Sequence, residues 1–134
     1  MKAVQAQDYG AADQLKLETA PIPQPGPGQV RVKLHSAGVN PADWKMRAGL
    51  YKQFMPLNLP WTPGLEGAGI VDTVGAGMTG FKPGQAVFGL FNNSYAEYAM
   101  PGAEDLAAKP ESLSFTARLP RWRICRRAFG SVAY

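Results

Sequence analysis

PGLEGAGIVDTVGAGMTGFKPGQAVFG, residues 63–89, is the stretch that decides the fold. Residues 67–74 alternate and are rich in apolar and β-branched side chains, which is typical of a strand. The apolar positions on one face of that strand are Ala68, Ile70 and Val74. Residues 82–85, KPGQ, indicate a tight turn, because proline fixes its own φ and glycine tolerates a positive one. With a second strand beginning at Ala86, the stretch predicts the middle of a β-barrel or β-sandwich.

The same stretch contains a glycine pattern that imitates a cofactor motif. Residues 75–80, GAGMTG, satisfy G-x-G-x-x-G and follow a strand, which is half of the dinucleotide-binding fingerprint. The other half is a helix whose N-terminus faces the pyrophosphate. Pro83 and Gly84 follow too soon for a helix to grow there. We therefore expect a glycine-rich turn and no dinucleotide site at residues 75–80.

The composition indicates a single, mainly β domain. The chain has 134 residues, 46% of them hydrophobic, which is enough for a core without disulfides. Its 15 glycines and 12 prolines leave no interval free of both longer than residues 90–100, so long helices are not expected. The sequence has no apolar run of membrane-spanning length and no signal-peptide pattern, so we expect a cytoplasmic protein.

Metal-ligand and charge patterns restrict the possible partners. Cys125 and His35 are the only residues of their types, so they cannot build a disulfide or an ordinary zinc site. The net charge of +4 is uneven: residues 1–117 carry nine Lys/Arg and ten Asp/Glu, whereas residues 118–134 carry five arginines and no acid. Nucleic-acid binding is therefore not expected of the body of the chain, and only the tail is a candidate for it.

The remaining elements follow from the same patterns. Further strands are predicted at residues 1–6, 15–19, 29–36 and 95–100, with a short edge segment at residues 106–110. Within residues 29–36 the apolar and polar positions alternate strictly, and His35 falls on the polar face as a solvated histidine rather than a catalytic base. Six or so short strands with frequent turns predict one barrel-like β domain over residues 1–117.

One short helix is predicted directly after the strand at residues 29–36. Asn40 is a favoured N-cap residue, and Pro41 is favoured at the first helical position. Gly49 is typical of the residue that ends a helix at its C-terminus. Asp43 lies in the first turn, where the helix dipole favours an anion. From the pattern alone, helix-start chemistry explains Asn40 and Asp43 better than a functional role does.

Three stretches, taken together, resemble a known family. They are PGPGQVRVKLHSAGVNPADWKMRAGLY (residues 25–51), PGLEGAGIVDTVGAGMTGFKPGQAVFGL (63–90) and SYAEYAMPGAEDLAAKPESLSF (94–115). In this order and spacing they are similar to the N-terminal GroES-like domain of medium-chain dehydrogenases/reductases. The resemblance covers residues 1–116 and is closest to the zinc-independent, zeta-crystallin-like quinone oxidoreductases. It implies a mainly β fold, a partly open GroES-like barrel with one or two short helices.

The resemblance also implies a site and a reaction. Asn40 and Leu65 stand where the zinc-dependent relatives have metal ligands, and neither binds zinc, so no metal is expected. By resemblance, the catalytic residues are Asn40, Asp43 and Tyr51, and the cofactor-binding residues are Asn40, Asp43 and Lys45. The implied reaction is hydride transfer from NADPH to a quinone or an α,β-unsaturated carbonyl, with the protein supplying orientation and a hydrogen-bond donor.

The family pattern also predicts what should follow this domain. Its members continue into a Rossmann domain, and no strand–GxGxxG–helix unit occurs up to Tyr134, so we expect an enzyme truncated before its cofactor-binding domain. Residues 118–134 are predicted to be an atypical arginine-rich tail from a shifted reading frame, with a selected basic arm as the alternative. The competing function is a non-catalytic GroES-like remnant or interaction module. If the shifted-frame interpretation is right, the domain interface should lie exposed and favour self-association.

Overall fold

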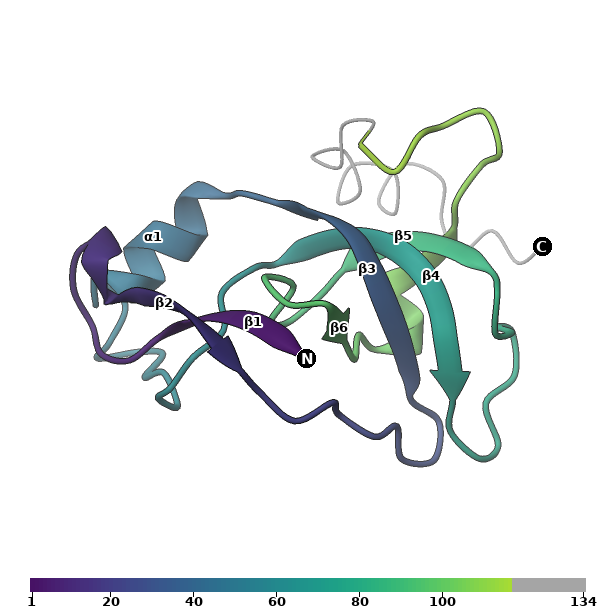
Figure 1. The fold of residues 1–134 in the computed structure, drawn as a ribbon, viewed down its shortest axis with the longest axis horizontal. Coiled ribbons are helices and arrows are strands. Elements are labelled where there is room, and N and C mark those ends of the chain that lie inside the picture. Colours follow the sequence, from purple (N-terminus) through teal and green to yellow (C-terminus); the bar gives the residue numbers. More distant parts are fainter. Residues whose placement is uncertain (117–134) are drawn as a thin grey trace.

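The computed structural model describes residues 1–116, and they form two antiparallel sheets and one short α-helix (Figure 1). The strands are β1 (Lys2–Ala6), β2 (Leu15–Thr19), β3 (Val30–Gly38), β4 (Glu66–Val74), β5 (Ala86–Leu90), β6 (Tyr98–Ala99) and β7 (Leu106–Ala108). Helix α1 is Pro41–Arg47, and the 3₁₀ turns are Ala12–Gln14 and Ala103–Asp105. The predicted arginine-rich tail lies outside the described residues. Within them, no helix is both long and apolar enough to cross a membrane.

The larger sheet has five strands in the order β6-β3-β4-β5-β7, and β1 pairs with β2 in a separate two-stranded sheet. Isolated bridges also join β1 to segments outside the named strands, from Ala3 to Ala96 and from Ala6 to Trp61. They do not close into a complete barrel, which confirms the mainly β, partly open fold. The strand predicted at residues 95–100 is shorter than expected, because only Tyr98–Ala99 pair with β3.

The core lies on one face of the larger sheet. Its buried members are Val30, Val32, Val71, Val87, Phe91, Ala99 and Leu106. Val71 belongs to this cluster and Val74 packs against it, so these two side chains lie on the same face of the sheet. The prediction that Val74 shares a face with Ala68 and Ile70 is therefore wrong. The reason is a bulge at Asp72, because Arg31 pairs with Thr73 and the next residue pairs with Val71.

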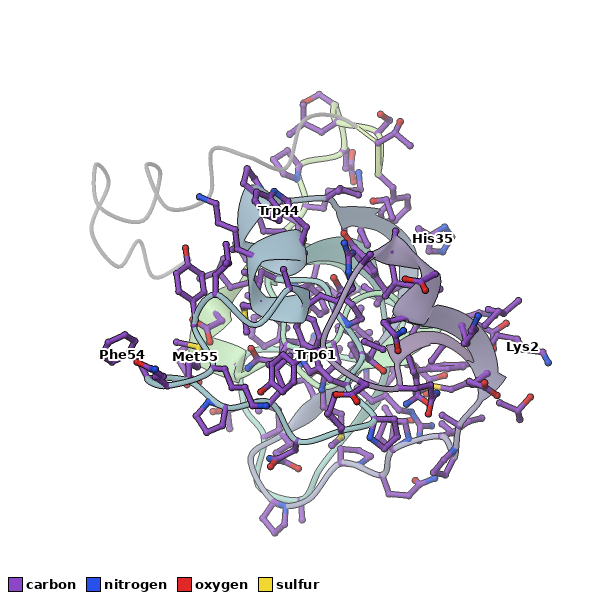
Figure 2. All side chains as sticks on the ribbon, turned by 90° about the vertical axis from the view of Figure 1, so that its left-hand side faces the viewer. Lys2, His35, Trp44, Phe54, Met55 and Trp61 are labelled. Carbon is purple, nitrogen blue, oxygen red and sulfur yellow. The ribbon has the colours of Figure 1, made fainter. Side chains whose placement is uncertain are left out.

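A second bulge falls on His35, between the pairs Leu34–Gly69 and Ser36–Ala68. Its side chain is exposed, as the sequence predicts, and points away from the body in Figure 2. The imidazole nevertheless has a partner, because it stacks on the Phe115 ring with the centroids 4.4 Å apart.

The glycine-rich stretch after β4 forms turns and is not followed by a helix. Gly77 and Gly80 adopt φ values of 74° and 97°, which glycine tolerates without strain. Gly84, in the KPGQ turn, has φ 88°. The prediction that residues 75–80 make a glycine-rich turn from which no helix grows is confirmed.

Arg31 fastens the proline-rich connector to the sheet. Its guanidinium pairs with Asp72, with Nη2 at 2.6 Å and Nε at 2.7 Å from Oδ2. Nη1 also donates to the carbonyl oxygen of Pro23 at 2.8 Å. The guanidinium carbon lies 5.6 Å from the centroid of the Tyr98 ring. The hydrogen bond to Arg31 holds the pKa of the Asp72 carboxyl below its usual 3.8, against the opposing effect of burial.

Candidate functional site

The predicted site begins where β3 ends and α1 starts. Asn40 is extended (φ −117°, ψ 149°) and Pro41 is the first helical residue, which is the arrangement that the N-cap pattern predicts. The backbone N–H of Asn40 donates to Asp43 Oδ2 at 2.7 Å, as in a capping box. After the C-cap, Gly49 takes φ 80° and ends the helix. The helix-start interpretation of Asn40 and Asp43 is therefore confirmed.

Asp43 is more deeply buried than its place in an exposed helix suggests, with only 5% of its surface exposed. Besides the Asn40 N–H, its carboxylate accepts the Gly64 N–H at 3.2 Å and the Tyr95 hydroxyl at 3.2 Å. These three described donors to Asp43, two backbone N–H groups and one hydroxyl, are all neutral. Three donors to one buried carboxylate make this side chain the centre of the site's polar network.

Tyr95 holds the other end of that network. Burial, followed by the charge and the hydrogen bond of Asp43, raises the pKa of its hydroxyl to about 12. The hydroxyl is therefore protonated at any physiological pH. It acts as a donor to Asp43 and not as an acid or a base.

Two loops lock the residues around Asp43. The Ser94 hydroxyl donates to the carbonyl oxygen of Glu66 at 2.9 Å, and the Ser94 N–H donates to the carbonyl oxygen of Gly64 at 3.2 Å. Gly64 has φ 106°, and a Cβ there would clash with Ser94 Oγ and lie 2.7 Å from Tyr95 Cδ1. Glu66 also accepts a 3.4 Å hydrogen bond from the Asn40 side-chain amide. Sequence reasoning missed Tyr95, Ser94 and Glu66.

Of the four predicted site residues, the structure brings Asn40 and Asp43 into direct contact. Lys45 is half-buried, with Nζ 5.8 Å from the Trp44 ring centroid. Tyr51 lies in the turn after α1 with 39% of its surface exposed. No hydrogen bond between side chains within residues 1–116 joins Lys45 or Tyr51 to the other two. Their proposed roles remain predictions.

Exposed apolar side chains are frequent in and around α1 and in the loop that follows it. We call this set the 39–59 apolar surface, and its members are Val39, Trp44, Leu50, Tyr51, Phe54, Met55 and Leu59. Phe54 is 88% exposed and projects from the body in Figure 2, with Met55 next to it. Large exposed apolar patches are typical of binding or interface surfaces.

A cavity of about 230 Å³ lies elsewhere, between the start of β1 and the segment leading into β6. Its lining residues are Met1, Gln5, Ala20, Pro21, Pro23, Thr62, Asn92, Asn93, Ala96, Tyr98, Ala99 and Met100. None of the predicted site residues lines it. Within the described part of the chain, no three His, Cys, Asp or Glu side chains gather closely enough to hold a metal ion.

Comparison with known proteins gives one consistent result. The family described as the alcohol dehydrogenase GroES-like domain matches residues 26–127, ten residues beyond the predicted boundary at 117. A quinone oxidoreductase from Rattus norvegicus is 35% identical over 139 residues, covering 98% of this chain and 42% of the relative. The Homo sapiens quinone oxidoreductase is 38% identical over 118 residues, covering 86% of this chain and 35% of the relative. The chain thus spans about two fifths of the length of these relatives.

Solved structures agree with these relatives. The quinone oxidoreductase from Coxiella burnetii superimposes with a TM-score of 0.81 at 32% identity, covering 86% of this chain and 38% of that one. A mycobacterial protein complexed with NADPH gives a TM-score of 0.79 at 32% identity, covering 86% and 35%.

Proposed function

The chain belongs to the alcohol dehydrogenase GroES-like domain family, and from this membership we propose that it forms the catalytic-domain portion of an NADPH-dependent oxidoreductase. The proposed substrates are a quinone or an α,β-unsaturated carbonyl. The observation that carries the proposal is the Asn40–Asp43 pair, held rigidly at the start of α1 beside the 39–59 apolar surface. A flat, weakly polar substrate suits a surface rich in aromatic and aliphatic side chains.

In this proposal each residue has a distinct task. Asn40 is half-buried, and its side-chain amide is the polar group nearest to the ligand. Lys45 contributes to cofactor binding, and Tyr51 contacts the substrate from the exposed turn after α1. Bound NADPH supplies the hydride. The residues of this chain orient the two reactants and exclude water from them.

The residues present fit the nicotinamide end of that cofactor and not its phosphates. The amide of Asn40 provides both hydrogen-bond donors and an acceptor, which suits an uncharged ring with a carboxamide. Within residues 1–116 no strand, glycine loop and helix are arranged to cradle a pyrophosphate. The phosphates therefore need groups other than those described, and we expect this chain alone to bind NADPH weakly.

Zinc is not part of the proposed chemistry. Asn40 and Leu65 occupy the positions at which the resemblance would require metal ligands, and an amide and an aliphatic side chain suit zinc poorly. Reduction of the substrate carbonyl then depends on hydrogen bonding rather than on a Lewis acid.

An NMR titration of the ¹⁵N-labelled chain with NADPH tests the proposal. We expect the side-chain amide signals of Asn40 to shift, with a Kd of about 1 mM, equivalent to about 4 kcal/mol. Asn40→Ala should weaken binding at least threefold, by about 0.7 kcal/mol or more. Asn92→Ala, in the separate cavity, is the matched control and should leave binding unchanged.

Two outcomes would count against this function. An unchanged spectrum at several millimolar NADPH would favour the non-catalytic interaction module instead. Equal losses in Asn40→Ala and Asn92→Ala would show that NADPH binds without using the predicted site. A 1,4-benzoquinone titration, read at the Tyr51 backbone amide, tests the substrate side separately.

A further inference from the structure

Two residues at the start of α1, Asn40 and Asp43, form one line of hydrogen bonds with the distant Tyr95. The Tyr95 hydroxyl donates to Asp43 Oδ2, and the Asn40 N–H donates to the same oxygen. Tyr95 and Asp43 are 52 residues apart in sequence. A displacement of the tyrosine hydroxyl therefore changes the carboxylate oxygen that fixes the backbone of Asn40.

Asp43 is badly placed to touch a ligand itself. Only 5% of the residue is exposed, and both carboxylate oxygens already accept hydrogen bonds from the protein. Asn40 is half-buried and therefore more exposed than Asp43. Because Asn40 is the partner of Asp43 that is proposed to contact the ligand, Asp43 can influence binding through the position of Asn40.

Tyr95 is anchored on both sides of its side chain. Its N–H donates to the carbonyl oxygen of Pro63 at 3.0 Å, and its own carbonyl oxygen accepts the Val4 N–H at 2.8 Å. Its ring lies so close to Gly64 that a Cβ there would be 2.7 Å from Tyr95 Cδ1. The backbone and ring are fixed independently of the hydroxyl, so removing the hydroxyl removes one contact to Asp43 and leaves the packing in place.

We propose that Tyr95 is a positioning residue of the Asn40 site, acting through Asp43 and making no contact with the ligand. This inference rests on the proposed function for its effect on NADPH. The hydrogen bonds on which the inference depends are present in the chain without any ligand. Asp43 then has a different role from the one that the resemblance implies: it transmits position and does not take part in the chemistry.

Hydrogen exchange in the free chain tests the positioning role without any ligand. Tyr95→Phe should reduce the protection of the Asn40 amide about tenfold, as expected for the loss of about one charge-assisted hydrogen bond. The Val32 amide, in the core strand β3, should keep its protection. Tyr98→Phe is the matched control, and it should leave Asn40 unchanged because Tyr98 lies by Arg31.

Two results would overturn the inference at this stage. Unchanged exchange at Asn40 in Tyr95→Phe would mean that the hydroxyl does not position it. An equal fall in protection at Asn40 and Val32 would mean that Tyr95 only contributes to global stability.

A mutant cycle measured with NADPH tests the route through Asn40. In the wild-type background, Tyr95→Phe should weaken NADPH binding about threefold. In the Asn40→Ala background, the same substitution should leave the Kd for NADPH unchanged. Equal losses in the two backgrounds would overturn the route. Failure of the wild-type chain to bind NADPH would refute the proposed function, and the exchange experiment would still decide the role of Tyr95.

Discussion

Replacing Arg31 by methionine should destabilise the domain by about 2 kcal/mol, because the side chain joins the sheet to the proline-rich connector. The Arg31 side chain is 13% exposed and that of Asp72 is 30% exposed, so the pair is partly shielded from water. A hydrogen bond to a charged group contributes about 1.5–3 kcal/mol, and water can partly rehydrate Asp72 in the variant. Methionine keeps an unbranched apolar side chain, so the lost stability reports on the guanidinium group.

The measurement is urea unfolding followed by tryptophan fluorescence. Lys33→Met is the matched control, because Lys33 is an exposed cation two residues along the same strand. It should change the free energy of unfolding by less than about 0.5 kcal/mol. In a double-mutant cycle, Arg31→Met and Asp72→Asn should show a coupling free energy of about 1 kcal/mol. Equal effects of the two methionine variants would refute the reasoning.

The pH dependence gives a second check with a defined sign. The pKa of Asp72 is lowered in the folded state, so the pair stabilises the protein above the usual pKa of 3.8. That contribution is lost as the pH falls through the lowered, folded-state value. The stability difference between wild type and Arg31→Met should therefore stay constant from pH 7 to about pH 5 and shrink below about pH 4. A difference that disappears already at pH 6 would contradict this assignment.

Three further predictions concern the site and its surroundings. Gly64→Ala should destabilise the protein by at least 2 kcal/mol more than Gly84→Ala. Both glycines have a positive φ, but only at Gly64 would a Cβ clash with Ser94. Equal shifts in the thermal unfolding midpoint of the two variants would contradict this. Phe54→Ser should reduce self-association of the chain, measured by sedimentation velocity. Leu17→Ser is the control, because Leu17 is exposed on β2, and it should leave self-association unchanged. A wild-type chain that is monomeric would refute this prediction. Zinc-loaded, desalted protein should retain far less than one zinc per chain by elemental analysis, and one tightly held ion would overturn the zinc-independent assignment.

The sequence predicts the order and type of the elements well, because most are decided by local patterns. Alternation locates β3 and β4, and the Asn40–Pro41 pair locates the start of α1. The two bulges escape such patterns, since a bulge at Asp72 depends on which residue of the partner strand is opposite. The face assignment of Ile70 is wrong for that reason.

The site is predictable only in part. Asn40 and Asp43 are three residues apart, so helix-start chemistry brings them together. The contacts of Asp43 with Gly64 and Tyr95 join residues 21 and 52 positions away, and no local rule specifies them. The available signal in the sequence is the side-chain chemistry of Ser94 and Tyr95, two adjacent hydroxyls shortly before β6.

The pairing of β3 has a consequence for synthesis on the ribosome. This strand emerges early, but one of its two edges is completed only by β6, more than sixty residues later (Figure 1). Until then its edge amides and the apolar side chains of Val30 and Val32 have no complete partner, which is the condition in which nascent chains need protection from aggregation. Ribosome-bound chains with β6 still inside the exit tunnel should remain protease-sensitive, and protection should appear once β6 and β7 have emerged. Early protection would instead mean that the β3–β4 hairpin folds by itself.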